Sequence, residues 1–178
     1  FLPMALRKIV LDGDPILKKV CRPVTDFSEK TAQLLEDMEE TLLDANGLGL
    51  AGPQVGVMRR ICIVLDVGEE HDGCAPEEGE EVPEYPFIEL INPEIIDRQG
   101  AVTIYEGCLS FPGRNGAIER PEQVTVKALD RNGKEFTATR RGIVARAICH
   151  ECNHLDGITI LDLADHFYED TEEGMEEE

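Results

Sequence analysis

Two histidines four residues apart, His150 and His154, are the residues whose type and spacing point most directly to chemistry. Side chains at positions i and i+4 of a helix lie on one face, so both imidazoles can reach a single metal ion. Glu151, beside the first histidine, is placed to carry protons rather than to bind the metal. The pattern indicates a metal-dependent hydrolase, and the alternative is a helix that carries two histidines on its surface.

The third protein ligand distinguishes the metal sites that share this pattern. Proteases with the sequence HExxHxxGxxH need a histidine at position 160, and Ile160 stands there. Four downstream side chains remain as alternative ligands: His166, Glu169, Glu172 and Glu173. They lie in or beside a segment rich in charge and poor in packing residues, where no further ordered helix is predicted.

Cys108 is the stronger candidate for the third ligand. It follows a predicted strand and stands between Gly107 and Leu109, where a thiolate can point into a pocket. Cys149 and Cys152 are closer in sequence, but at about 100° per residue they face away from the two histidines. One cysteine and two histidines leave a fourth coordination position open, as a catalytic site requires.

The hydrophobic pattern predicts the elements that position these residues. Residues 142–155 form a helix in which both histidines continue an apolar face, so the metal lies on its core side. A second amphipathic helix is predicted over residues 28–45, with Gly47 as its stop, after a short helical stretch over residues 14–20. Strands are predicted over 60–67, 87–96 and 101–105, and a hairpin over 123–129 and 135–139. Pro93 indicates an edge or a bulge in the second of these strands.

The segment between the long helix and the first strand alternates small and apolar residues. Its three glycines match the dinucleotide pattern G-x-G-x-x-G in letters. However, the run follows a helix rather than a strand, and Pro53 interrupts the helix that such a loop requires. Residues 47–54 are therefore expected to form an extended edge along which a peptide can align.

The composition favours one globular domain without a nucleic-acid partner. With 178 residues, of which 42% are hydrophobic and 30% charged, the chain is long enough to bury a core. A net charge of −20 argues against nucleic acid, because phosphates need Lys and Arg. There is no apolar run of about 18 residues, so no membrane span is predicted. Six cysteines without a recognisable secretory signal favour a reducing cytoplasm over disulfides.

Three segments, residues 47–54, 106–110 and 150–154, together resemble the signature motifs of bacterial-type peptide deformylases in content, order and spacing. The resemblance covers nearly the whole chain except an acidic insertion and an acidic tail. It implies an α+β fold, in which antiparallel β-sheets pack around a central helix that carries the HExxH motif. The expected organisation is a single catalytic domain over residues 1–168, with the insertion at 68–86, and a disordered tail at 169–178.

The resemblance implies a hydrolase that removes the formyl group from the N-terminal formylmethionine of newly made polypeptides and releases formate. Cys108, His150 and His154 are then the ligands of one divalent ion, with water at the open position. The family characteristically uses Fe²⁺, and Zn²⁺, Ni²⁺ or Co²⁺ can occupy such a site. Glu151 would take the proton of the water and pass it to the departing amine.

The same resemblance assigns supporting residues. The side-chain amide of Gln54 and the backbone N–H of Leu109 would stabilise the developing oxyanion. Glu106 would pair with Arg120 and brace the strand that leads to the cysteine. Three backbone positions are expected to pair with an extended substrate: Leu48, Gly49 and Gly107. The methionine side chain is expected in an apolar pocket near Ile143, Ala147 and the aliphatic part of Arg146.

Two positions depart from the family pattern. Gly52 replaces the usual alanine, a change expected to loosen the loop more than to alter the chemistry. Asn153 stands where the family normally has aspartate, which keeps the size and hydrogen bonding but removes the charge. Activity is expected to survive, with a risk of weaker metal binding.

Two other functions remain open from the sequence. The first is an HExxH zinc metalloprotease that cuts internal peptide bonds, and the second is a structural module whose metal is fully ligated by protein. For a deformylase, the partners are the N-termini of nascent polypeptides in a bacterial cytoplasm. Binding of nucleic acid or membrane is not expected, and the chain is expected to be a monomer or a weak homodimer.

Overall fold

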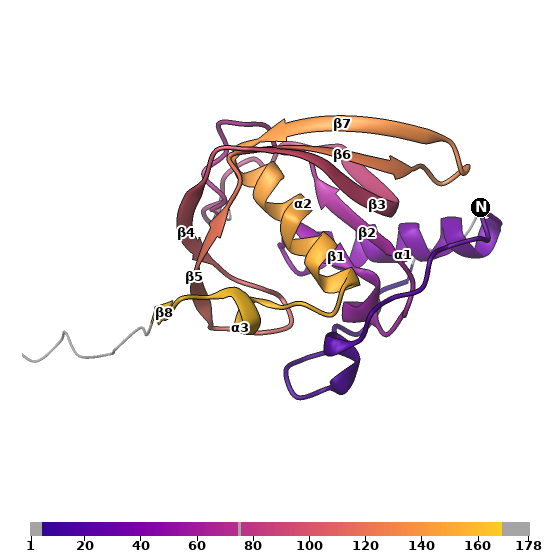
Figure 1. The fold of residues 1–178 in the computed structure, drawn as a ribbon, viewed down its shortest axis with the longest axis horizontal. Helices are drawn as coiled ribbons and strands as arrows, with labels where there is room; N and C mark the ends of the chain where they lie inside the picture. The colour runs from indigo at the N-terminus through magenta and orange to yellow at the C-terminus, as the bar shows by residue number, and fades with distance from the viewer. Residues whose placement is uncertain (1–4, 75, 169–178) are drawn as a thin grey trace, which may run out of the picture.

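The computed structural model of the protein describes residues 5–74 and 76–168. Its architecture is α+β, with two antiparallel sheets and a central helix, α2 (Gly142–Leu155), which Figure 1 shows lying against the concave side of the sheets. The fold class predicted from the sequence is confirmed. The expected disordered tail, residues 169–178, lies outside the described residues.

The larger sheet has five strands in the order β1-β2-β3-β6-β7, and each strand is antiparallel to its neighbours. Its strands are β1 (Gly49–Ala51), β2 (Ile61–Leu65), β3 (Phe87–Gln99), β6 (Gln123–Leu129) and β7 (Glu135–Arg141). The smaller sheet has the order β4-β5-β8, with β4 (Val102–Glu106), β5 (Asn115–Arg120) and β8 (Phe167–Tyr168). The other helices are η1 (Pro15–Lys18), α1 (Glu29–Asp44), η2 (Gly52–Val55) and α3 (Ile160–Leu163).

The predicted helices, strands and hairpin are all present, with small shifts at their ends. Ser28 caps α1, and β3 changes register between Ile91 and Glu94, which confirms a bulge at the predicted proline. Asn46, with φ of 54°, rather than Gly47 adopts the left-handed conformation after α1, so the predicted stop is wrong by one residue.

Four short elements were not predicted: η2, β5, α3 and β8. The helix α3 follows the histidine helix with Thr159 as its cap and ends before His166; the three downstream glutamates lie outside the described residues. The strand β8 has only two residues and exists because it pairs with β5. Such elements carry too few residues for a periodic signal.

The position of β2 between two helices explains why its sequence is apolar at successive positions. Cys62 and Val64 pack in the cluster that contains α2, whereas Ile61 and Ile63 pack in the cluster that contains α1. Since successive side chains of a strand point to opposite faces, the larger sheet is covered by a helix on each side. The helix α2 is thereby held against a buried strand, which gives its histidines a rigid base.

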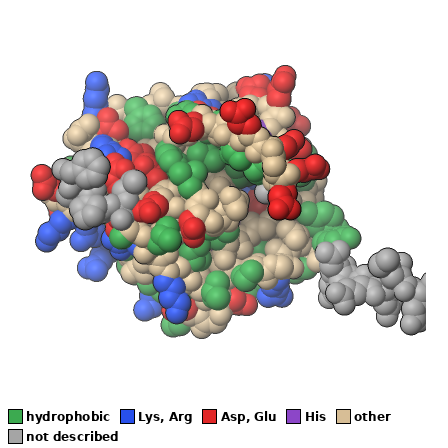
Figure 2. Space-filling model, turned by 180° about the vertical axis from the view of Figure 1, so that it is seen from behind, with side chains coloured by type: hydrophobic (Ala, Val, Ile, Leu, Met, Phe, Trp, Pro, Cys, Tyr) green, Lys and Arg blue, Asp and Glu red, His purple; other side chains and the backbone are tan. Residues whose placement is uncertain are grey.

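The acidic insertion, residues 68–86, contains no helix or strand within its described residues, and nearly all of its side chains are exposed. This agrees with the predicted surface loop. Figure 2, which looks onto the face behind Figure 1, shows acidic side chains gathered toward the upper right and basic ones mostly toward the left and lower edges. None of the helices in residues 5–74 and 76–168 has the length and apolarity needed to cross a membrane.

Two glutamates from α1 and β3, Glu39 and Glu89, lie close together beside Arg131. The guanidinium of Arg131 binds Glu89 at 2.6 Å. Burial, followed by the hydrogen bond to Glu89, raises the pKa of Glu39 from 4.5 to about 8. Because this pKa is higher in the folded protein than in the unfolded chain, the folded state holds an extra proton between these values. Its stability therefore falls as the pH rises through that window.

We expect Glu39→Gln to raise the free energy of unfolding by on the order of 1–3 kcal/mol at about pH 9 and to change it little at about pH 5. Glutamine remains a donor to Glu89 but cannot lose a proton, so the penalty at high pH disappears. Thermal unfolding of both proteins at the two pH values measures this difference. The exposed Glu94→Gln is the control, and a gain of equal size at both pH values would contradict the prediction.

Candidate metal centre

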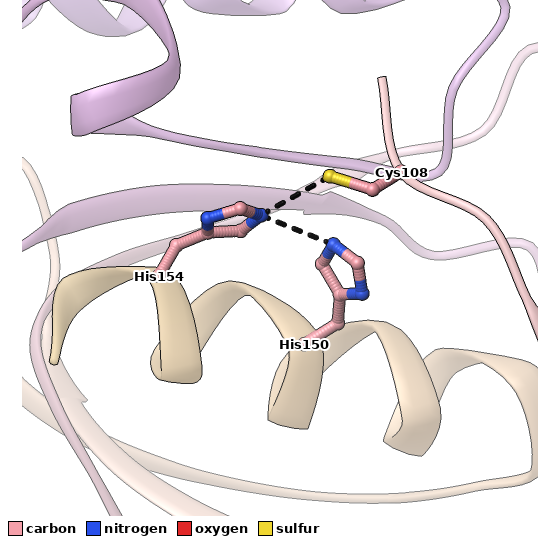
Figure 3. A group of neighbouring side chains, drawn as sticks. All are labelled: Cys108, His150 and His154. Atoms are coloured by element: carbon pink, nitrogen blue, oxygen red, sulfur yellow. Dashed lines mark hydrogen bonds between the residues drawn. The ribbon is translucent and has the colours of Figure 1, made fainter. Parts of the chain in front are cut away.

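Three donor atoms converge where α2 faces the turn after β4. The Nε2 atom of His154 lies 3.3 Å from Sγ of Cys108 and 3.2 Å from Nε2 of His150. All three atoms are within 4.8 Å of one another, and Figure 3 shows the side chains pointing toward a common centre. Ligand atoms of a tetrahedral ion, bound at 2.0–2.3 Å, lie roughly 3.3–3.8 Å apart. The arrangement therefore fits one metal ion.

The other ligand candidates that the structure describes are not brought to this centre. His166 is exposed, and its ring accepts or donates a hydrogen bond at 2.9 Å with the hydroxyl of Tyr105. Cys149 is buried in the core around α2, and Cys152 contacts the thiol of Cys62. Among the residues that the structure describes, the metal-binding group consists of one cysteine and two histidines. The three downstream glutamates lie outside the described residues.

A buried ion-pair network holds His150 from behind. Its Nδ1 lies 2.7 Å from Oε2 of Glu106, which leaves Nε2 directed at the metal centre. Arg120 donates to both carboxylate oxygens of Glu106, at 3.1 and 2.7 Å, as the predicted pair requires. Burial alone would raise the pKa of Glu106, but the hydrogen bonds from His150 and Arg120 outweigh it and hold that pKa well below its usual value. Glu106 is therefore a carboxylate.

Two residues complete this network in ways that the sequence did not reveal. Arg146 was expected to contribute only its aliphatic part to a pocket, yet its guanidinium donates to Glu106 at 3.1 Å and to the carbonyl oxygens of Ile118 and Val102. Asn153 accepts a hydrogen bond from Arg120 through Oδ1. The amide thus retains the acceptor role open to an aspartate, without its charge. The sequence offered one signal for this role of Arg146: it stands four residues before His150, on the same face of the helix.

Gln54 is held with its amide group facing the metal centre. Its Oε1 accepts from the N–H of Ala51 at 3.0 Å, and its Nε2 donates to Oγ of Ser110 at 3.1 Å and lies 3.5 Å from Sγ of Cys108. Ser110 is fully buried and was not assigned a role from the sequence, although a serine beside the cysteine offered a hint. Because both ends of the amide are engaged, its orientation is determined by the protein.

The side chain and the backbone N–H of Leu109 have different roles at this site. Its side chain packs so closely on Gly47 that a Cβ there would lie 2.8 Å from Cδ1 of the leucine, which ties the turn after β4 to the segment after α1. The N–H of Leu109 has no hydrogen-bond partner within the described part of the chain. It is thus a donor available to a ligand in the neighbouring cavity.

Glu151 lines the same cavity, and one of its carboxyl oxygens has no partner among the described residues. The residue is 3% exposed, and its Oε2 makes no hydrogen bond to any described residue. Burial raises the pKa of the Glu151 carboxyl to about 7. A carboxyl group with a pKa near neutrality can both accept and release a proton, although a cation at the centre would lower this value again.

A cavity of about 460 Å³ opens beside the metal centre. The six residues predicted to bind substrate all line it: Leu48, Gly49, Gly107, Ile143, Arg146 and Ala147. The strand β1 is the edge of its sheet and leaves one side of its backbone unpaired by any described strand. The expected extended edge is therefore present for the residues of β1, whereas the following four residues turn into η2.

Gly52, at the start of η2, lies in a tighter place than the sequence suggested. A Cβ at this position would lie 2.7 Å from the carbonyl oxygen of Val57 and 2.9 Å from that of Arg59. The predicted loosening of the loop is wrong, because the missing methyl group lets two backbone segments approach each other. The glycine thus brings the segment that carries Gln54 close to the start of β2.

Gly49 leaves the room that the Glu151 carboxyl occupies. A Cβ at Gly49 would lie 2.5 Å from Oε1 and 2.8 Å from Cγ of Glu151. We expect Gly49→Ala to displace this carboxyl and to lower kcat/KM by roughly 10- to 100-fold, while the bound metal stays in place. Hydrolytic rates and metal content measured on one preparation test this. Wild-type kcat/KM in the variant would show that the carboxyl moves without consequence.

Several known proteins are similar to this chain in sequence and in fold. A family model described as polypeptide deformylase matches residues 6–169. The peptide deformylase of Caldicellulosiruptor bescii is 45% identical over 169 residues, which cover 95% of this chain and 92% of that protein. The crystal structure of the peptide deformylase from Thermotoga maritima has a TM-score of 0.78 at 34% identity, covering 91% of this chain and 99% of the other. A Met-Ala-Ser-bound peptide deformylase from Acinetobacter baumannii has a TM-score of 0.78 at 32% identity, with 90% and 99% coverage.

Proposed function

The chain belongs to the polypeptide deformylase family, and we propose that Cys108, His150 and His154 hold its catalytic metal ion. It is accordingly a hydrolase that removes the formyl group from the N-terminal formylmethionine of newly made polypeptides and releases formate. The observation that carries the assignment of the centre is the convergence of one sulfur and two nitrogen atoms within 4.8 Å.

The donor set suits a divalent ion of intermediate softness. A thiolate and two imidazoles accept Fe²⁺, which we propose as the resident ion, and equally Zn²⁺, Ni²⁺ or Co²⁺. Such an ion supplies Lewis acidity, which makes water more acidic and polarises a carbonyl group. The hydrogen bond from Nδ1 of His150 to Glu106 supports this role, because it directs the Nε2 lone pair to the centre.

Glu151 is proposed as the proton carrier of the reaction. Glu151 lines the cavity and its Oε2 has no partner among the described residues, so the carboxyl group can accept a proton from the attacking water. The same carboxyl then gives this proton to the amine as the bond between formyl carbon and nitrogen breaks. A buried carboxyl without another partner is well suited to both steps, since no competing hydrogen bond holds it in one protonation state.

Gln54 and Leu109 are proposed to stabilise the negative charge that develops on the formyl oxygen. The Nε2 amide of Gln54 lies 3.5 Å from Sγ of Cys108, and Leu109 lines the cavity with an N–H that has no described partner. Donors placed before the reaction begins cost no reorganisation, and each is typically worth about 3 kcal/mol of barrier. Ser110 and the N–H of Ala51 keep the glutamine amide in this orientation.

The substrate is proposed to bind as an extended strand. Leu48, Gly49 and Gly107 offer backbone groups beside the unpaired edge of β1, and such pairing tolerates many side chains. The methionine side chain would enter the part of the cavity near Ile143 and Ala147. The neighbour from Acinetobacter baumannii holds Met-Ala-Ser, a peptide of the same class as the product expected here.

Newly made polypeptides are the partners, and the curated relatives are bacterial. We place the enzyme in the bacterial cytoplasm, where these chains emerge, and propose that it acts as a monomer or weak homodimer without contacting RNA. The rival protease function is not favoured, because His166 bonds to Tyr105 and is not part of the described metal-binding group.

The test is release of formate from formyl-Met-Ala by protein loaded anaerobically with Fe²⁺. The expected result is stoichiometric release of formate and of a free amino group, with no cleavage of an unformylated protein such as casein. Metal content is measured on the same sample. A protein with one metal ion per chain that releases no formate, or that cleaves casein, would contradict the proposal.

A further inference from the structure

The metal centre lies where two separately packed parts of the core meet. The helix α2 packs with strands of the larger sheet, in a cluster of buried side chains that includes none of the described residues of β4 or β5. Cys108, which Figure 3 shows on a segment apart from that helix, packs against a different cluster, formed by Leu17, Phe111, Ile118 and Ile160. Apolar packing within either cluster therefore does not by itself determine the distance between the cysteine and the two histidines.

Arg146 crosses the boundary between these two clusters. It belongs to α2, and its guanidinium donates to the carbonyl oxygens of Val102 in β4 and Ile118 in β5, at 2.9 and 3.1 Å. The guanidinium also donates to Oε1 of Glu106 at 3.1 Å. Glu106 ends β4 and precedes Cys108 by two residues. One side chain of the histidine helix thus holds both strands that flank the cysteine in sequence.

These contacts of Arg146 are shielded from water. Its side chain is 4% exposed, and that of Glu106 is 7% exposed. A buried guanidinium needs partners for its donors, because an unpaired charge in the interior of a protein is costly. A displacement of the smaller sheet relative to α2 would separate the guanidinium from its acceptors without water to replace them. The side chain therefore resists such a displacement.

The carboxylate of Glu106 is held from two sides. Arg120 donates to both of its oxygens, and Oε2 also pairs with Nδ1 of His150 at 2.7 Å. Arg146 binds the other oxygen, Oε1, and so restrains the rotation of the carboxylate that would turn Oε2 away from the histidine. The strand that leads to the cysteine and the first histidine are thus joined in one buried network.

We propose that Arg146 is a positioning residue of the metal centre, which fixes the turn that carries Cys108 against the helix that carries His150 and His154. This role rests on the proposed function and deepens it, because it makes the affinity for the metal ion depend on a side chain that is not a ligand. It differs from the role expected for its aliphatic part in the methionine pocket. A pocket residue acts on the binding of substrate, whereas a positioning residue acts on the metal ion before substrate binds.

The experiment compares Arg146→Met and Arg146→Lys with the wild-type protein, using Co²⁺ as the metal ion. Methionine is unbranched and has no donor, whereas lysine keeps the charge but donates from a single nitrogen atom. We expect Arg146→Met to lower the affinity for Co²⁺, measured by competition with a chelator, by roughly 10- to 100-fold. The sulfur-to-metal charge-transfer band should weaken or shift, because the sulfur of Cys108 is held less firmly. Arg146→Lys should recover part of both.

Arg140→Met is the matched control. Arg140 in β7 likewise donates to a carboxylate, that of Asp66 at 3.2 and 3.1 Å, and to the carbonyl oxygen of Thr139. Arg140 and Asp66 are not among the residues that line the cavity, so this variant should leave the affinity for Co²⁺ and the band unchanged. Thermal unfolding of the metal-free proteins is measured first, and binding is measured well below the lowest midpoint.

Wild-type affinity and an unchanged band in folded Arg146→Met would overturn the proposed role. If this variant does not fold, Arg146→Lys decides, with an expected loss of affinity of about 3- to 10-fold, and unchanged affinity there would overturn the role. A change in KM for formyl-Met-Ala alone would assign Arg146 to the methionine pocket instead. Because metal binding needs no turnover, absence of formate from the wild-type protein would refute the proposed function, while weaker Co²⁺ binding in Arg146→Met would still support the positioning role.

Discussion

Replacement of Cys108 by serine is expected to lower the affinity for the metal ion by roughly 100-fold or more. The thiolate supplies the one anionic and soft ligand of the three, and a neutral hydroxyl in its place is a weak ligand for Fe²⁺ or Zn²⁺. The two histidines remain on α2, held by a rigid helix, so the fold should persist. Competition with a chelator of known affinity measures the change.

The absorption spectrum distinguishes loss of the sulfur–metal bond from loss of folding in this variant. The Co²⁺-loaded protein should show a sulfur-to-metal charge-transfer band that Cys108→Ser abolishes, while the thermal unfolding of the metal-free proteins stays similar. Cys74→Ser, which changes an exposed cysteine of the insertion, is the matched control and should leave the band intact. Unchanged metal affinity in Cys108→Ser would contradict this prediction. It would favour a third ligand downstream of His154 and, with it, the protease function.

Glu151→Gln is expected to lower kcat by about 10³-fold while metal content stays at one ion per chain. Glutamine has the shape of glutamate but cannot accept the proton of the attacking water. The carboxyl is buried beside Gly49 with one oxygen unpartnered, so the substitution breaks no hydrogen bond of that oxygen to a described residue. The loss should therefore appear in kcat much more than in KM or in thermal stability.

The measurement combines steady-state kinetics with metal analysis of the same preparation. A fall in activity that follows a fall in metal content would assign Glu151 to metal retention rather than to proton transfer. Retention of more than about a tenth of wild-type kcat would exclude it as the proton carrier.

Much of this enzyme can be read from local sequence. The four-residue spacing of His150 and His154 requires only the geometry of a helix, and the hairpin between β6 and β7 requires only its Asn-Gly turn and alternating flanks. The apolar run of β2 likewise predicts a strand buried on both faces. The sequence also favours Cys108 as the third ligand, because the alternatives face away from the histidines or lie in a polar segment.

The tertiary structure decided what depends on contacts between distant segments. Arg146 turns its guanidinium onto Glu106, and Ser110 holds Gln54 across 56 residues of sequence. The part of the cavity wall formed by Asp72 exists only because the insertion folds back on α2. Such contacts leave no periodic or spacing signal, since each partner looks like an ordinary polar residue in its own segment.

The sequence by itself determined the helix, the ligand types and the class of reaction, because these follow from local geometry and the chemistry of a few side chains. Only the fold decided how the centre is supported: which arginines neutralise Glu106, which way Gln54 faces, and where Gly49 makes room for Glu151. The physical reason is that burial, pairing and excluded volume are properties of the packed chain and not of any one segment of it.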